Sequence, residues 1–99
     1  MLKTNKESFK ALYRALLSLE NEKECEEFLA DICTIQELES LAQRLQVAQM
    51  LDEGKSYLEV NKETGVSTAT IGRVSRCLNY GKGGYKSVIE KLKEEKENA

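Results

Sequence analysis

Hydrophobic residues near the N-terminus recur every three or four positions, which is the spacing of an amphipathic helix. This spacing predicts a helix over about residues 5–19, with an apolar stripe made of Phe9, Leu12, Tyr13, Leu16 and Leu17. A second, acidic helix is expected after Asn21, whose side chain can cap its N-terminus. The apolar side of this helix consists of Cys25, Phe28, Leu29 and Ile32.

A capping-box pattern, in which Thr34 is followed three residues later by Glu37, predicts the start of a long third helix. This helix should end near Gly54, because glycine readily adopts the left-handed conformation found after helix C-termini. Its apolar positions are Ile35, Leu38, Leu41, Leu45 and Ala48.

The second half of the chain predicts three shorter helices. Ser56 and Glu59 repeat the capping-box pattern, and Gly65 should end the short helix that they open. Ser67 caps the next helix, over residues 68–79, and glycines at 81, 83 and 84 separate it from a last amphipathic helix at about 85–96. Six helices and no strand indicate an all-α protein, which we expect to be one domain over residues 1–99.

Two helices joined by a short turn around a glycine are typical of the helix-turn-helix, here about residues 57–79. The residues expected to lock the two helices together are Val60, Val66, Ile71 and Val74. The outward residues of the second helix are small, hydroxylic or basic, which suits contacts with bases and phosphates. They are Ser67, Thr68, Ala69, Thr70, Gly72, Arg73 and Arg76. A hairpin that only packs two helices is the alternative interpretation.

The net charge of −2 conceals an asymmetry between the two halves of the chain. Residues 1–53 carry six basic and eleven acidic side chains, whereas residues 54–99 carry nine basic and six acidic ones. No acid lies between Glu63 and Glu90, a stretch that contains Arg73, Arg76, Lys82 and Lys86. This basic stretch coincides with the helix-turn-helix and favours double-stranded DNA as the partner, although a solvated helix face would have the same charge.

The absence of histidine excludes histidine-based acid-base catalysis and histidine metal sites, so we expect neither an enzyme nor a metal or other cofactor. No apolar run is long enough to cross a membrane, and no signal peptide is evident, so a cytoplasmic protein is expected. The three cysteines show no paired spacing and are expected to be small buried hydrophobic residues.

The chain also resembles a known protein family. The segment TIQELESLAQRLQVAQMLDEGKSYLEVNKETGVSTATIGRVSRCLNYG is similar to the Trp repressor family, and the whole chain to its YerC/YecD-type branch. The resemblance implies a six-helix fold in which the N-terminal helices of two subunits, about residues 5–53, interlock into an obligate homodimer. It also implies paired helix-turn-helix units that bind palindromic DNA.

The resemblance further implies an effector pocket, since the threonine and two arginines that hold tryptophan in the repressor correspond to Thr34, Arg44 and Arg73. Two positions differ from the repressor, which has glycine at the place of Val74 and serine at the place of Cys77. We expect Val74 to fill the pocket and tryptophan not to bind, in which case Arg44 would form a surface ion pair and Arg73 a phosphate contact.

The sequence thus favours a dimeric, sequence-specific transcriptional regulator, most simply a repressor. Residues 67–76 would face bases, and Lys82 and Lys86 would lie near phosphates. One alternative is a protein-interaction module that keeps the same helical fold without binding DNA. Another is a sensor whose effector is smaller than tryptophan.

Overall fold

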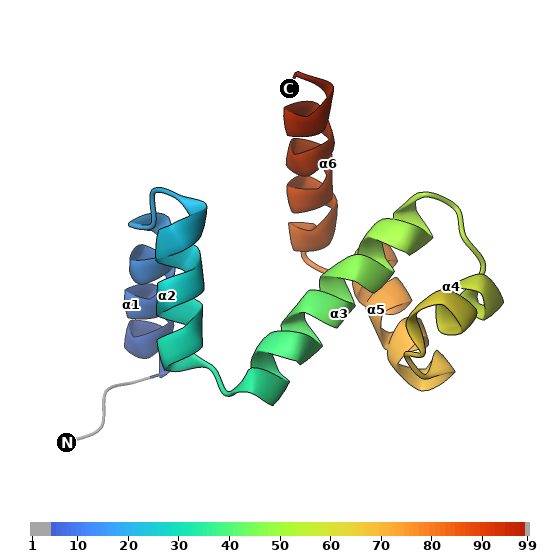
Figure 1. Ribbon diagram of the computed structural model, residues 1–99, viewed down its shortest axis with the longest axis horizontal. Coiled ribbons are helices and arrows are strands. Elements are labelled where there is room, and N and C mark those ends of the chain that lie inside the picture. The colour runs from blue at the N-terminus through green and yellow to red at the C-terminus, as the bar shows by residue number, and fades with distance from the viewer. Residues whose placement is uncertain (1–4, 99) are drawn as a thin grey trace. The chain divides into compact units, whose positions relative to one another are not determined.

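The computed structural model describes residues 5–98, and over this range it consists of six α-helices and no strand (Figure 1). The predicted all-α class is therefore confirmed. The helices are α1 (Asn5–Leu17), α2 (Glu22–Ile32), α3 (Ile35–Asp52), α4 (Tyr57–Thr64), α5 (Thr68–Tyr80) and α6 (Gly84–Glu97). The chain divides into two compact units, one ending at Leu38 and the other beginning at Glu39, so one domain over the whole chain stays a prediction.

In the N-terminal unit, side-chain caps begin the helices as the sequence predicts. Asn21 Oδ1 accepts the backbone N–H of Glu24 at 2.9 Å and begins α2. At the start of α3, the Thr34 hydroxyl accepts the Glu37 N–H at 3.1 Å, and the Glu37 carboxylate accepts the Thr34 N–H at 2.8 Å. This reciprocal pair is the expected capping box, and it satisfies two backbone donors that a helix start otherwise leaves open.

The N-terminal unit has an apolar stripe but no core of its own. The helices α1 and α2 run in opposite directions (Figure 1), and among their residues none is buried. Phe9, Tyr13 and Leu17 are all more than half exposed. The amphipathic pattern of α1 is present as predicted, and the N-terminal unit by itself does not bury it.

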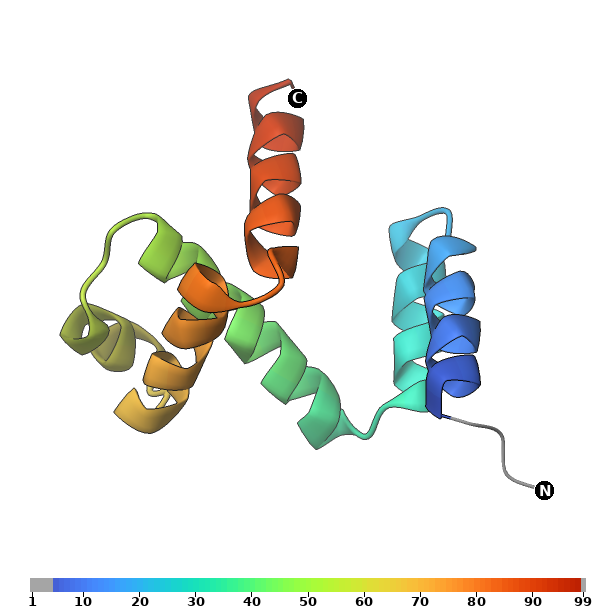
Figure 2. The same cartoon turned by 180° about the vertical axis from the view of Figure 1, so that it is seen from behind.

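The C-terminal unit contains the hydrophobic core. Helix α5 packs against both α4 and α6, and Figure 2 shows α3 crossing the same group of helices. The buried apolar residues are Val47, Ala48, Met50, Val60, Val66, Ile71, Val74, Leu78 and Ile89. Lys93 Nζ on α6 also forms an ion pair of 2.6 Å with Asp52 Oδ2 at the end of α3.

The prediction that the cysteines are buried is wrong. Cys25 and Cys33 are half-buried, and Cys77 is exposed. The first two belong to the N-terminal unit, where no described residue is buried, and Cys77 on α5 lines a pocket at the surface. Residues 5–98 contain no helix that combines the length and hydropathy needed to cross a lipid bilayer.

Candidate nucleic-acid interface

A turn of three residues joins α4 to α5. Ser56 caps α4 by accepting the Glu59 N–H at 3.2 Å, and Gly65 ends it with a positive φ of 75°. This left-handed conformation favours glycine, which has no Cβ to clash with the neighbouring carbonyl. After Val66, Ser67 caps α5 by accepting the Thr70 N–H at 3.2 Å. Local sequence signals thus set both ends of the turn.

Polar side chains brace the turn from inside. The Thr64 hydroxyl donates to the Val60 carbonyl at 2.6 Å and accepts the Val66 N–H at 3.1 Å. The Asn61 side-chain amide donates to the Val66 carbonyl at 2.8 Å. Sequence reasoning did not assign these roles, although a threonine and an asparagine beside a turn glycine are a usable signal for such bonds.

The predicted apolar lock between the two helices is confirmed. Val60 and Ile71 are fully buried, and Val66 and Val74 are nearly so. Because α5 also packs against α6, its inner face is covered along most of its length. The remaining face of α5 is therefore held at a defined angle to α4.

Most of the residues predicted to face outward are exposed in the structure. Five of them, Ser67, Thr68, Ala69, Arg73 and Arg76, are exposed, whereas Thr70 and Gly72 are half-buried. The Ser67 hydroxyl donates to Thr70 Oγ1 at 3.1 Å, so these two side chains are partly engaged with each other. A Cβ at Gly72 would lie 3.9 Å from Cε2 of Tyr57, which places the first residue of α4 beside the second turn of α5.

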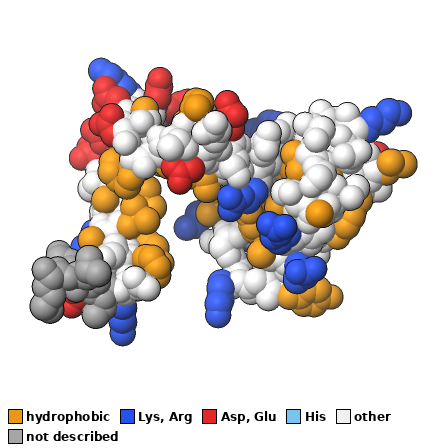
Figure 3. Space-filling model, turned by 90° about the horizontal axis from the view of Figure 1, so that it is seen from below, with side chains coloured by type: hydrophobic (Ala, Val, Ile, Leu, Met, Phe, Trp, Pro, Cys, Tyr) orange, Lys and Arg blue, Asp and Glu red, His pale blue; other side chains and the backbone are white. Residues whose placement is uncertain are grey.

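The basic side chains of this region have no acidic partners within the described residues. Arg73, Arg76, Lys82 and Lys86 are exposed, and the two ion pairs found between residues 5 and 98 involve Lys55 and Lys93 instead. Figure 3 shows several Lys and Arg side chains gathered on one part of the C-terminal unit without an acidic side chain between them. The positive charge there is available to an anionic partner.

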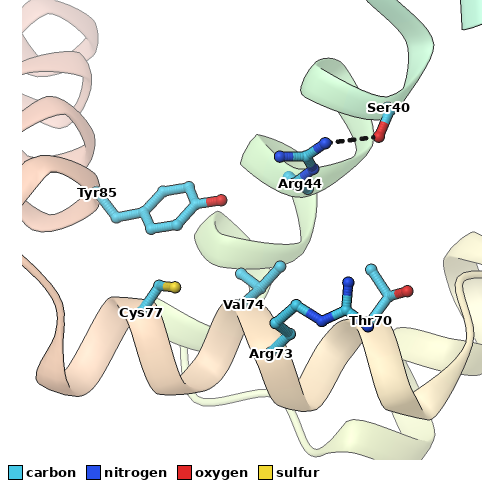
Figure 4. A pocket seen from close by; sticks show the side chains of 7 residues that line it. All are labelled: Ser40, Arg44, Thr70, Arg73, Val74, Cys77 and Tyr85. Carbon is cyan, nitrogen blue, oxygen red and sulfur yellow. Dashed lines mark hydrogen bonds between the residues drawn. The ribbon is translucent and has the colours of Figure 1, made fainter. Parts of the chain in front are cut away.

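A pocket of about 270 Å³ lies between α3, α5 and the start of α6 (Figure 4). Its lining residues are Ser40, Arg44, Thr70, Arg73, Val74, Cys77 and Tyr85. Four of the five residues expected in an effector pocket thus come together, namely Arg44, Arg73, Val74 and Cys77. The fifth, Thr34, lies in the N-terminal unit, where it caps α3.

Val74 forms part of the wall of this pocket and is only 3% exposed. That it fills the place of an effector stays a prediction, whereas the expected ion pair of Arg44 is wrong. Arg44 forms no ion pair within the described residues, since its guanidinium donates to the Ser40 hydroxyl at 3.0 Å. Sequence reasoning missed Ser40, although it stands four residues before Arg44, and Tyr85, which only the packing of α6 brings to the pocket.

No group of three or more potential metal ligands occurs among residues 5–98. The candidate interface presents exposed guanidinium and ammonium groups, hydroxyls and small apolar side chains. Such a surface can bind an anionic polymer.

Comparisons with known proteins agree with this architecture. The family model described as Trp repressor protein matches residues 7–93. The chain is 53% identical over 83 residues to "Uncharacterized protein YerC" of Bacillus subtilis (strain 168), which covers 84% of this chain and 80% of that protein. These matches span both units.

Two crystal structures are also similar. A TrpR-like protein from Eubacterium eligens ATCC 27750 has a TM-score of 0.84 and 48% identity, over 90% of this chain and 95% of its own. A proposed Trp repressor from Staphylococcus aureus has a TM-score of 0.83 and 43% identity, over 87% and 86%. With the match of the family model over most of its length, the chain belongs to the Trp repressor family.

Proposed function

We propose that this protein is a non-enzymatic, DNA-binding transcriptional regulator that binds palindromic DNA as a homodimer and acts as a repressor. The observation that carries the proposal is the uncovered face of α5, which is held rigidly in a helix-turn-helix and bears no acidic residue. Recognition helices of this motif enter the major groove and contact base edges through their N-terminal residues. The described surface has the shape and charge that such docking needs.

The proposed contacts divide between bases and phosphates. Residues 67–76 would face bases, with Arg73 and Arg76 able to pair with guanine O6 and N7 through two parallel hydrogen bonds. Lys82 and Lys86 follow α5 in the glycine-rich connection and the first turn of α6, where mobile ammonium groups suit phosphate contacts.

The uncovered apolar stripe of α1 supports the dimer. Its residues Phe9, Leu12, Tyr13, Leu16 and Leu17 are exposed within the N-terminal unit. Exposed contiguous apolar surface marks an interaction site, and a second copy of the same chain would cover it symmetrically.

Selection from random duplex DNA, followed by footprinting, tests the regulator directly. We expect a two-fold symmetric footprint with major-groove contacts about one helical turn apart. Arg76→Ala should cost about 1–3 kcal/mol on the selected site and relax discrimination at one symmetric pair of positions. Lys82→Ala and Lys86→Ala should instead weaken binding to all duplexes and lower the salt slope by about one unit each.

Lys10→Ala is the control for charge, because it removes the same charge from α1, outside the helix-turn-helix. It should leave the salt slope unchanged. If the protein binds no duplex at low salt, the protein-interaction module becomes the better interpretation, with the acidic N-terminal half as the surface for a basic partner.

The pocket beside α5 supports a second proposal, which is regulation by a small anionic effector. Two guanidinium groups, of Arg44 and Arg73, line it without a carboxylate partner among residues 5–98. Its volume of about 270 Å³ falls just below the usual range of about 300–1,000 Å³ for ligand pockets, so a small ligand is expected. We still expect no tryptophan binding, because the branched side chain of Val74 stands in the wall.

Calorimetry with tryptophan and with smaller carboxylates tests this second proposal. Micromolar binding of tryptophan would overturn the prediction against it, and binding of none would remove the effector role. Val74→Gly should enlarge the pocket, at a cost in stability of about 1–3 kcal/mol.

A further inference from the structure

The start of α5 with its cap, residues 67–72, contains no side chain suited to bidentate recognition of a purine. Arginine and lysine read guanine, and asparagine and glutamine read adenine, but residues 67–72 include none of these four types. The first such residue is Arg73. If α5 enters the major groove, its leading end must read bases by another means.

The hydroxyl groups at this end are largely occupied by the helix cap. Ser67 accepts the Thr70 N–H and donates to the Thr70 hydroxyl, so both side chains hold the start of α5. What remains on the exposed surface is small and largely apolar. It consists of the Ala69 methyl group and the side chain of Thr68, whose methyl group stands beside its hydroxyl.

Helix α4 begins beside the second turn of α5. The Tyr57 ring lies near Gly72, with Cε2 3.9 Å from the position that a Cβ would take there. The next residue, Leu58, is 75% exposed and takes no part in the core. An exposed leucine therefore stands at the start of α4, the end of that helix that lies beside α5.

We infer that Leu58, Thr68 and Ala69 form a thymine-reading surface, which binds the C5-methyl groups of thymine in the major groove. Thymine is the only standard base that presents a methyl group there, and alanine and threonine methyl groups are among its usual contacts. The inference rests on the proposed function and deepens it, because it states which base each half-site carries opposite the start of α5.

Replacing thymine by deoxyuridine in the selected duplex tests the inference with a minimal change. Deoxyuridine pairs with adenine and keeps the O4 acceptor, but it lacks the methyl group. Burial of one methyl group contributes about 0.8 kcal/mol. Replacing one contacted thymine should therefore weaken binding about fourfold, and replacing a symmetric pair should weaken it about fifteenfold. The loss should be confined to one or two symmetric pairs of positions.

Two variants assign the effect to the thymine-reading surface. Leu58→Ala and Ala69→Gly should each reduce the affinity ratio between thymine and deoxyuridine duplexes at one pair of positions. Leu58→Ala should leave the fold intact, because the side chain is exposed. Arg76→Ala serves as the comparison, since it should weaken binding to both duplexes and leave their ratio unchanged.

The outcomes separate the inference from the proposed function. If the protein binds its selected duplex and tolerates deoxyuridine at every position, the inference is wrong and the regulator stands. A thymine preference that persists in both variants would also overturn it, because DNA shape would then explain the preference. Failure to bind any duplex at low salt would overturn the inference and the regulator together.

Discussion

The two units of this chain differ in whether they bury their apolar residues. In the C-terminal unit, nine apolar side chains are buried by α3, α4, α5 and α6. In the N-terminal unit, α1 and α2 bury no residue, although their apolar stripes are about as regular as that of α5. Amphipathic periodicity therefore identifies an apolar face on each helix. It does not show whether the unit that contains the helix buries that face.

This difference assigns different proposed roles to the units. A helix-turn-helix that recognises DNA needs a fixed shape. The core of the C-terminal unit supplies this shape through Val60, Ile71 and Val74. An exposed stripe on α1 instead suits assembly, because burial of apolar surface drives association as it drives folding. Under the proposed function, one unit makes the dimer and the other reads the DNA.

The largest effect is expected from placing a charge in the stripe of α1. Leu16→Glu should abolish the dimer, because burying an unpaired carboxylate at an interface costs on the order of several kcal/mol. Ala11→Glu is the matched control, since it adds the same charge on the opposite face of α1 and should leave the dimer intact. Sedimentation measures both variants. A wild-type protein that is a folded monomer at micromolar concentration would contradict the assigned role of this unit.

The next largest effect should come from a substitution in the hydrophobic core of the C-terminal unit. Ile71→Ala removes most of a fully buried side chain from α5 and should lower the free energy of unfolding by about 2–5 kcal/mol. Leu58→Ala on the exposed side should change it by no more than about 0.5 kcal/mol. Urea denaturation at a fixed protein concentration compares the two. Equal losses of unfolding free energy in the two variants would contradict the assignment of Ile71 to the hydrophobic core.

Removing a helix cap should have a smaller effect in either unit. Ser67→Ala deletes the acceptor of the Thr70 N–H and should cost about 1 kcal/mol. Asn21→Ala deletes the equivalent bond to Glu24 in the N-terminal unit and should cost about the same. Ser67→Asp keeps a capping oxygen, so its thermal denaturation should resemble that of the wild type. A loss as large as that of Ser67→Ala would show that the cap is not the cause.

The smallest effect is expected for the ion pair between α6 and α3. A hydrogen bond to the Asp52 carboxylate, together with its negative charge, raises the pKa of Lys93 above the ordinary value of 10.5. The stabilisation is therefore fully present below pH 10.5 and is lost as the pH rises through the raised pKa. Lys93→Gln should slightly lower the melting temperature near neutral pH, and the difference should vanish at strongly alkaline pH. Lys91→Gln removes the same charge from α6 outside this ion pair, so it should leave the melting temperature near neutral pH close to that of the wild type.

The sequence by itself determined the six helices and the residues that lock the helix-turn-helix. Caps at Asn21, Thr34, Ser56 and Ser67 each act on backbone groups within a few residues, so their positions are visible in the chain. Helical periodicity likewise separates the buried face of α5 from the exposed one. Even so, the first helix ends at Leu17, two residues before the predicted end.

Only the tertiary structure decided which of these faces are covered. The sequence does not show that Cys77 is exposed or that Tyr85 joins Arg44 at a pocket. It also does not show how much free volume lies beside Val74, because that volume depends on the spacing of α3, α5 and α6. Periodicity is a property of one helix, whereas burial and cavity volume depend on how several helices pack together.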